Sequence, residues 1–183
     1  AAGLDFFEPE TGRLTPSLAP EADRPANRAN EAKCDAAGRL WLGTMQSNLE
    51  PDGSPRRMTA NTGALYRITP DGRFTREVDG VGLSNTLAWT EGGRELIFAD
   101  TLANILCKFP VGADGRLGER RLFSDEKLPG FCDRSAIDAQ GHLWNARFAG
   151  SRIVRFAPDG RVDRIVELPV SNPTSCCFGG DGL

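Results

Sequence analysis

The sequence lacks the features that mark several classes of protein. Among its 183 residues there is no apolar run long enough to span a membrane and no basic-then-apolar pattern at the N-terminus. Lysine plus arginine number 22 against 25 aspartate plus glutamate, a net charge of -3 without any basic cluster. Nucleic acid and anionic membranes are therefore not expected as partners, and we expect a cytoplasmic location.

Histidine and paired cysteines are also scarce. The single histidine, His142, follows a turn glycine, which leaves no credible Ser-His-Asp arrangement. None of the five cysteines belongs to a CxxC pair or has the spacing of zinc ligands. We expect these cysteines to be free thiols in a reducing compartment.

Glycine turns followed by short apolar strands occur three times. The segments are DAAGRLWLGT from Asp35, TEGGRELIFAD from Thr90 and DAQGHLWNAR from Asp138. Between them lie hairpins with Pro-Asp-Gly turns, flanked by segments rich in β-branched and aromatic residues. No segment combines the caps, periodicity and length of an amphipathic helix. The sequence therefore predicts an all-β fold.

The spacing of the turns predicts a β-propeller. Gly38, Gly93 and Gly141 are 55 and 48 residues apart, and four-stranded propeller blades repeat at about 40 to 50 residues. At roughly 45 residues a blade, the chain supplies about four blades. It opens inside a hairpin and stops where a strand should begin, so we expect residues 1–183 to be an interior segment of a single propeller domain, lacking N-terminal and C-terminal parts. A complete four-bladed propeller is the less favoured alternative.

Three polar side chains share one position in the repeat. Asn30, Asn85 and Asp133 each precede the turn glycine of their repeat by eight residues. Equal positions in successive blades would let these side chains converge on a central channel. A repeat could also reuse a turn-forming polar residue for folding alone. Asp35 and Asp138 belong to the glycine turns themselves, and we predict that they are structural.

Amide and carboxylate oxygens at this position point to metal chemistry. Without histidine or cysteine, such ligands suit a hard divalent cation like calcium, magnesium or manganese. A cation held this way can polarise a carbonyl group and lower the pKa of bound water. Asp133 is then a candidate metal ligand, a general base toward water, or both. Arg28 has the fork geometry to anchor a polyhydroxylated or carboxylate-bearing substrate.

These segments resemble the family of gluconolactonases, regucalcin (senescence marker protein) and luciferin-regenerating enzymes. RANEAKCDAAGRLWLGTM at 28–45 is similar to the family pattern R-x-N-D-G-K followed by a turn and W-x-G-T-M. SNTLAW at 84–89 is similar to S-N-G-L-A-W, and DRSAIDAQGHLW at 133–144 to D-G-x-x-x-D-x-x-G-x-L-W. PTSCCFGG at 173–180 resembles the family's late P-T-x-x-x-F-G-G segment. Four motifs in order are more specific than any one of them.

The resemblance implies a six-bladed propeller that binds one divalent cation on its axis and opens sugar lactones by hydrolysis, a step of carbohydrate metabolism. The cation implied is calcium, zinc, magnesium, manganese or iron. Asn85 and Asp133 match metal-ligand positions, and Asp133 also matches the catalytic base. Arg28 and Asn30 match substrate- or metal-pocket positions, and Glu31 stands where the family usually has an Asp. We assign all three residues to substrate binding.

The chain departs from the family pattern at several positions. Thr86 and Arg134 replace the glycines that follow the metal-binding Asn and Asp, and Ala32 replaces a glycine. The family's Glu-Gly-Pro segment, which carries a third metal ligand, has no match here. We predict a metal-dependent lactonase. Two alternatives stay open: a non-catalytic propeller that binds calcium or a small ligand, and an esterase or organophosphatase with an altered pocket.

Overall fold

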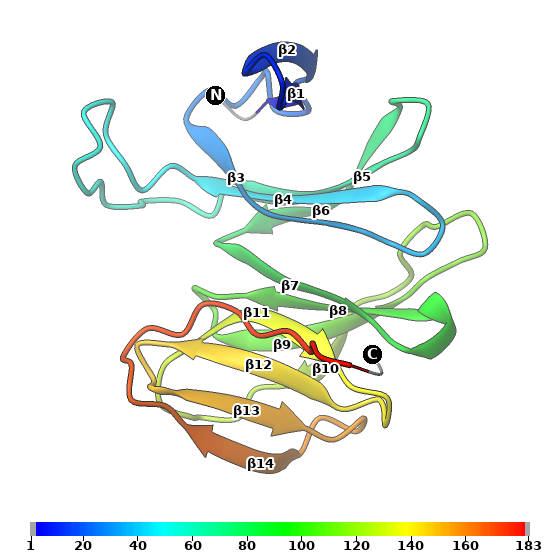
Figure 1. Ribbon diagram of the computed structural model, residues 1–183, viewed down its shortest axis with the longest axis vertical. Helices are drawn as coiled ribbons and strands as arrows, with labels where there is room; N and C mark the ends of the chain where they lie inside the picture. The colour runs from blue at the N-terminus through cyan, green and yellow to red at the C-terminus, as the bar shows by residue number, and fades with distance from the viewer. Residues whose placement is uncertain (1–2, 182–183) are drawn as a thin grey trace. The chain divides into compact units, whose positions relative to one another are not determined.

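The computed structural model describes residues 3–181 and confirms the all-β fold (Figure 1). Within these residues the only helical segment is a 3-10 turn, η1, at Glu91–Gly93. The strands are Leu4–Glu8 (β1), Arg13–Leu18 (β2), Asn27–Cys34 (β3), Leu40–Gln46 (β4), Gly63–Ile68 (β5), Phe74–Val81 (β6), Ser84–Trp89 (β7), Glu95–Asp100 (β8), Ile105–Pro110 (β9), Arg121–Ser124 (β10), Phe131–Ile137 (β11), Leu143–Phe148 (β12), Arg152–Phe156 (β13) and Val162–Glu167 (β14).

The strands form three four-stranded antiparallel sheets and one two-stranded hairpin. The four-stranded sheets have the orders β3-β4-β5-β6, β7-β8-β9-β10 and β11-β12-β13-β14, and the hairpin joins β1 to β2. Each sheet is thus a meander in which neighbours in the chain are neighbours in space, the architecture of a propeller blade. Among the described strands no sheet closes on itself, and the number of blades stays a prediction.

The Pro-Asp-Gly turns form as their residues predict. Gly72 has a φ of 81° and donates its amide to the carbonyl of Thr69, which closes the turn between β5 and β6. Gly160 has a φ of 89° and donates in the same way to Ala157, between β13 and β14. Only glycine adopts this left-handed backbone conformation without steric cost, so the two glycines fix the hairpins.

The chain divides into two compact units, residues 1–83 and residues 84–183. We call them the N-terminal unit and the C-terminal unit. In the N-terminal unit the buried side chains of Leu42, Ala64 and Tyr66 form the centre of an apolar cluster on β4 and β5. Leu4 of β1 and Leu18 of β2 pack against this cluster, so the first hairpin is held by hydrophobic contact with the β3–β6 sheet.

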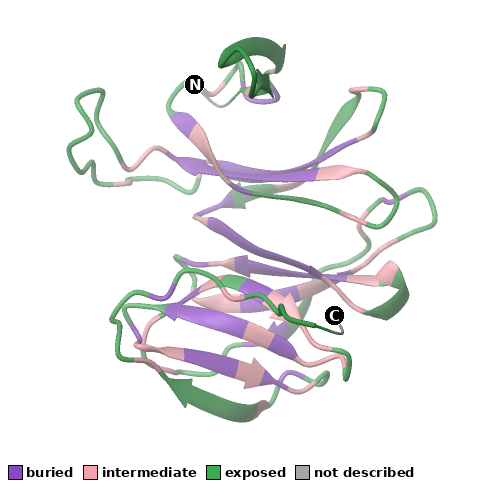
Figure 2. Cartoon of the chain, in the orientation of Figure 1, coloured by how far each residue is buried: buried purple, intermediate pink, exposed green. Residues whose placement is uncertain are grey.

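The C-terminal unit has a larger core, shared by its two sheets. Ala99 and Leu106 come from one sheet, and Leu143, Val154 and Phe156 come from the other. Full burial of a leucine, valine or phenylalanine side chain contributes about 1.5–3 kcal/mol. The first strands of the two sheets, β7 and β11, also contact each other. Burial decreases from β12 to the largely exposed β14, as Figure 2 shows.

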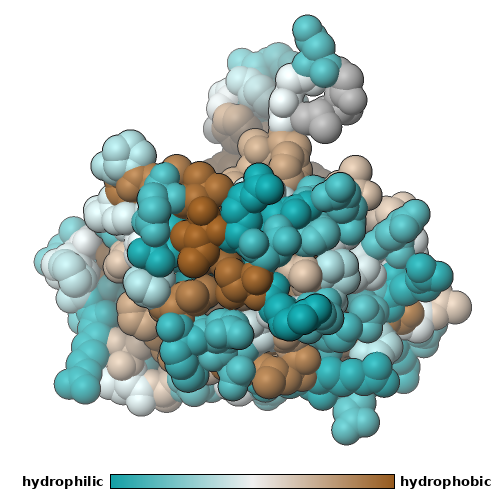
Figure 3. All heavy atoms as spheres, turned by 90° about the horizontal axis from the view of Figure 1, so that it is seen from below, coloured by the Kyte–Doolittle hydropathy of each residue, from teal (hydrophilic) through white to brown (hydrophobic). Residues whose placement is uncertain are grey.

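Several apolar side chains are exposed on and after the last strand. On β14, Ile165 and Val166 are exposed, as is Val170 after it. Figure 3, seen from the side on which β14 lies, shows hydrophobic side chains gathered among hydrophilic ones. None of the described segments forms a helix long and apolar enough to cross a membrane.

Candidate metal and substrate site

The first strand of every four-stranded sheet carries a β-bulge at the predicted site. In β3 the pairing with β4 skips Asn30, the extra residue between Ala29 and Glu31. In β7 the register shifts between Asn85 and Leu87, on either side of Thr86. In β11 the shift places two residues, Asp133 and Arg134, opposite a single residue of β12.

Bulges of this kind turn side chains away from the regular alternation of a strand and are enriched beside active sites. The eight-residue offset seen in the sequence thus corresponds to one structural event repeated in three sheets. Asn30 is the bulged residue itself, Asn85 directly precedes one, and Asp133 is part of one. Their convergence on one channel stays a prediction.

The structure brings Arg28 and Asn30 together in the N-terminal unit. Arg28 Nη1 donates to Asn30 Oδ1 over 3.2 Å and to the carbonyl of Ala29 over 2.9 Å. Arg28 Nε and Nη2 both donate to Asn48 Oδ1, at 3.1 and 2.9 Å. Burial lowers the pKa of the half-buried guanidinium, and these three partners are neutral. The positive charge of Arg28 is therefore held in place without being neutralised by them.

Glu31, the third predicted pocket residue, lies next to the bulge on β3. It pairs with Gly43 of β4, and only 7% of its surface is exposed. This is more buried than Arg28 or Asn30, which are both intermediate. The structure thus places all three predicted residues on one strand, with Glu31 deepest.

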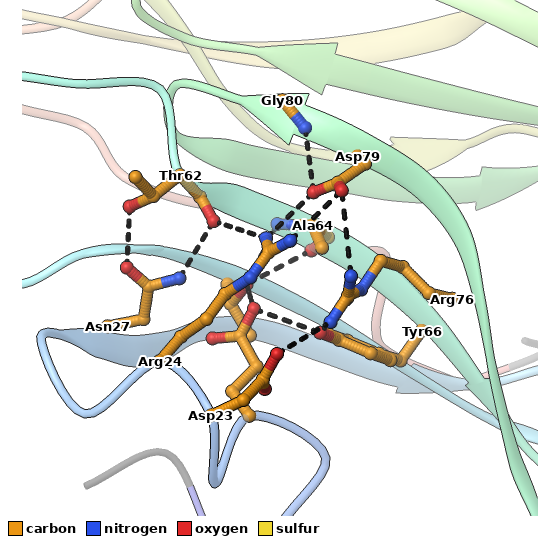
Figure 4. A network of polar contacts seen from close by, with 11 residues as sticks. Asp23, Arg24, Asn27, Thr62, Ala64, Tyr66, Arg76, Asp79 and Gly80 are labelled. Atoms are coloured by element: carbon orange, nitrogen blue, oxygen red, sulfur yellow. Dashed lines mark hydrogen bonds and ion pairs between the residues drawn. The ribbon is translucent and has the colours of Figure 1, made fainter.

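A polar network fixes the start of β3 (Figure 4). Arg24 donates to both carboxylate oxygens of Asp79 on β6, at 2.7 and 3.0 Å, and to the carbonyl of Thr62. Asn27, the first residue of β3, exchanges two side-chain hydrogen bonds with Thr62. The hydrogen bond from Arg24 lowers the pKa of Asp79 to about 2. The start of β3 and the residues before it are thereby tied to β6 and to Thr62, which precedes β5.

In the C-terminal unit a chain of hydrogen bonds orients Asn85. Asn85 Nδ2 donates to Thr101 Oγ1 over 2.9 Å, and the same hydroxyl donates to the carbonyl of Cys132 over 2.6 Å. Since the hydroxyl has a single proton, it must accept from Asn85, and this identifies the nitrogen of the amide. Asn85 Oδ1, the atom that could bind a metal, therefore points away from Thr101.

Asp133 is held mainly through its backbone. Its carbonyl accepts a hydrogen bond from Thr86 Oγ1 and another from Asn145 Nδ2, the latter over 2.9 Å. Its carboxylate oxygen Oδ1 accepts the amide of Arg134, whose own side chain is exposed. The Arg134 amide also lies 3.2 Å from the carbonyl of Thr174, in the segment PTSCCFGG. Asn85 lies on β7 and Asp133 lies on β11, and these two strands contact each other.

The donor set can be compared with the needs of a divalent cation. No group of three or more His, Cys, Asp and Glu side chains within residues 3–181 could hold a metal ion. Asn85 and Asp133 supply an amide and a carboxylate oxygen, the ligand types that calcium and magnesium prefer. A neighbouring side chain that fixes the orientation of a metal ligand strengthens metal binding, and Thr101 fixes the Asn85 amide in this way. These two residues therefore fit part of an oxygen-donor site.

Sequence reasoning missed the residues that support this site. Asn48, Thr101 and Asn145 contact predicted site residues or their backbone. Ser135 contacts Thr86 and Asn145. None of these four residues is a defining residue of the family motifs quoted above. Ser135 and Asn145 face each other across β11 and β12, a cross-strand pair that hairpin register alone would have suggested. Asn48 follows β4 in a loop, and no sequence signal identified it.

Proteins of one known family are similar to this chain. The sequence profile described as "SMP-30/Gluconolactonase/LRE-like region" matches residues 1–183. The chain belongs to this family. The resemblance predicted from four motifs is therefore confirmed.

Among the family's curated members, regucalcin of Gallus gallus is 36% identical over 163 residues, which cover 87% of this chain and 53% of that protein. The solved structure of the calcium-binding protein regucalcin from Agrobacterium tumefaciens matches with a TM-score of 0.83 and 30% identity, over 94% of this chain and 56% of that one. A gluconolactonase from Xanthomonas campestris matches with a TM-score of 0.79 over 96% of this chain and 58% of that one, and at 23% identity it supports the fold alone. The chain thus spans about half the length of the relatives it matches.

Proposed function

We propose that this chain is part of a metal-dependent lactonase that hydrolyses a sugar lactone, built on a six-bladed propeller. The observation that carries the proposal is the repeated bulge, because Asn30, Asn85 and Asp133 each lie in or directly beside the bulge in the first strand of a sheet. Family membership supports the same proposal, since the family model covers gluconolactonases and one similar solved structure is that of a calcium-binding regucalcin. Asn85 and Asp133 would hold one divalent cation, and calcium is the first candidate.

Substrate binding would rest on β3. Arg28 is fixed by Asn48, Asn30 and the Ala29 carbonyl, which take four of its five N–H groups. One N–H of Nη2 and a positive charge that these neutral partners do not neutralise remain for a carbonyl or hydroxyl oxygen of a lactone. Asn30 adds an amide that can donate to one hydroxyl and accept from another. Glu31 contributes the carboxylate nearest to this pair in sequence. A polyhydroxylated ring is the ligand class that such a set of groups recognises.

The chemical step would depend on Asp133. When bound, the cation would polarise the lactone carbonyl and favour attack by water. Asp133 accepts the proton of the attacking water as a new C–O bond forms at the carbonyl carbon. The bond between that carbon and the ring oxygen then breaks, and the ring oxygen takes up a proton. One water is added, and the product is an open-chain hydroxy acid.

A calcium-binding protein without catalytic activity is the second candidate. Thr86 and Arg134 favour it, because they replace glycines beside the two candidate metal ligands. The regucalcin relatives are compatible with this function as well.

Lactonase activity is tested with gluconolactone and xylonolactone as substrates, with EDTA and with added calcium, magnesium, manganese and zinc. We expect metal-dependent hydrolysis that Asp133→Ala reduces at least about 100-fold in kcat/KM, the contribution of a positioned acid–base group. Asp159→Ala is the matched control, since Asp159 is an exposed carboxylate of a Pro-Asp-Gly turn. Metal binding without turnover of any lactone would reject the enzyme in favour of the binding protein.

A further inference from the structure

We propose that Thr86 is a positioning residue that fixes the backbone of Asp133, and with it the orientation of that carboxylate toward the metal. The inference rests on the proposed function, since it concerns the same site. It assigns a role to a residue that stands where the family has a glycine, and to two polar neighbours, Ser135 and Asn145.

The backbone at Thr86 adopts a conformation that disfavours a β-branched residue, so contacts of the side chain must offset this cost. Thr86 has a φ of 48°, in the left-handed region that β-branched residues rarely adopt and glycine adopts freely. Its side chain is completely buried. A strained conformation of this kind persists only where surrounding contacts stabilise it. Those contacts lead directly to the bulge of β11.

Proton counting gives the direction of each hydrogen bond. Thr86 Oγ1 donates to the carbonyl of Asp133, which uses its single proton. Ser135 Oγ, 2.8 Å away, must therefore donate to Thr86. Asn145 Nδ2 then donates to Ser135 Oγ and to the Asp133 carbonyl, both over 2.9 Å. The Asp133 carbonyl accepts from two buried side chains, one on β7 and one on β12.

The side-chain hydrogen bonds to the Asp133 carbonyl take the place of regular strand pairing at the bulge. Asp133 lies in the bulge, outside the regular ladder between β11 and β12, so ladder hydrogen bonds do not set its peptide orientation. The two side-chain donors do so instead. Because the carboxylate leaves the same backbone, fixing the carbonyl restricts the directions in which the carboxylate can point.

The side-chain amide of Asn145 is oriented by its donor nitrogen and not by its acceptor oxygen. Its Oδ1 is buried and has no hydrogen-bond partner within the described residues, whereas its Nδ2 has several. Buried acceptors without partners are rare, because the lost hydration is not replaced. The amide is thus oriented to donate toward Asp133, at the expense of its own oxygen.

The experiment separates the hydroxyl of Thr86 from its volume. Thr86→Val keeps the shape and loses the hydroxyl, whereas Thr86→Ser keeps the hydroxyl. Calcium affinity is measured by isothermal titration calorimetry on the full chain, and hydrogen exchange of residues 131–137 is followed by mass spectrometry in EDTA. We expect Thr86→Val to weaken calcium binding about 10- to 100-fold, the effect of losing a hydrogen bond that orients a metal ligand, and to speed exchange of that segment. Thr86→Ser should stay within about threefold of the parent protein.

A control removes an equally buried hydroxyl elsewhere. Thr44 on β4 is fully buried and donates to Glu21, so Thr44→Val measures the loss of a hydroxyl without a link to Asp133. Its calcium affinity should match that of the parent chain. Equal affinity and equal exchange in Thr86→Val and the parent would overturn the inference and leave the proposed function standing. A parent chain that binds no divalent metal would overturn both.

Discussion

Two aspartates in the glycine turns, Asp35 and Asp138, make equivalent hydrogen bonds in different sheets. Each forms a clamp between its turn and the next strand. Asp35 Oδ2 accepts the indole Nε1 of Trp41 over 2.9 Å, and Asp138 Oδ2 accepts that of Trp144 over the same distance. The other oxygen of each carboxylate accepts backbone amides of its own turn. One side chain thus closes the turn and anchors the next strand, which agrees with the structural role predicted from sequence.

The charge of Asp138 makes this clamp sensitive to acid. Burial raises the pKa of Asp138, but hydrogen bonds from Trp144, the His142 amide and Arg155 outweigh it and hold the pKa far below its ordinary value. The native carboxylate therefore stays ionised where the unfolded one, with a pKa of about 3.9, takes up a proton. Its stabilisation is complete above that pH and is lost as the pH falls below it.

Asp138→Asn tests this linkage. We expect the free energy of unfolding of the variant to be about 1–3 kcal/mol lower than that of the parent at pH 6. The reason is that a neutral amide replaces the two charged oxygens that accept hydrogen bonds. The difference should shrink between pH 4 and pH 3, as measured by urea denaturation at each pH. Asp159→Asn, on an exposed turn, is the control. A difference that stayed constant down to pH 3 would contradict the proposed role of the charge.

At the scale of the elements, hairpins were predictable and their supporting contacts were not. The turns at Gly72 and Gly160 follow from local chemistry, since Pro-Asp-Gly specifies a backbone conformation within a few residues. The bulge positions were visible indirectly, as a polar residue at a constant offset from the turn glycine. The network around Thr86 depends on which strands of two sheets lie side by side, and a single sequence does not contain that information.

The two Pro-Asp-Gly turns allow one comparison between elements. A Cβ atom added to Gly160 would lie 1.8 Å from the carbonyl oxygen of Phe123, whereas one added to Gly72 would meet nothing within 4 Å. Both positions have a positive φ, so alanine at Gly72 should cost about 1 kcal/mol of stability. Gly160→Ala should cost at least about 3 kcal/mol, because β10 must also move.

Chemical denaturation of the two alanine variants measures these costs. Equal destabilisation by Gly72→Ala and Gly160→Ala would show that backbone conformation alone matters, and that the close approach of Phe123 is relieved without cost.

At the scale of the whole molecule, a bound cation would stabilise the fold. A ligand that binds only the native state raises the free energy of unfolding by about 2.7 kcal/mol when its concentration is 100 times its Kd. For a chain of this size that corresponds to a rise in Tm of roughly 5–10 °C. We expect calcium to raise the Tm measured by calorimetry and Asn85→Ala to abolish the rise.

Asn172→Ala serves as its control, since Asn172 is exposed in the segment after β14. A rise in Tm that persisted in Asn85→Ala would remove Asn85 from the metal site.

The bulge that recurs in β3, β7 and β11 has a consequence for how such a protein changes over evolutionary time. When such a sheet is duplicated, the copy keeps the bulge, and with it a position at which a side chain is turned out of the regular alternation of the strand. A single substitution in one copy then alters the chemistry offered there, while the remaining copies keep theirs. New specificity arises when one sheet changes while the others keep their residues, and Thr86 beside Asn85 stands where the similar family pattern has a glycine.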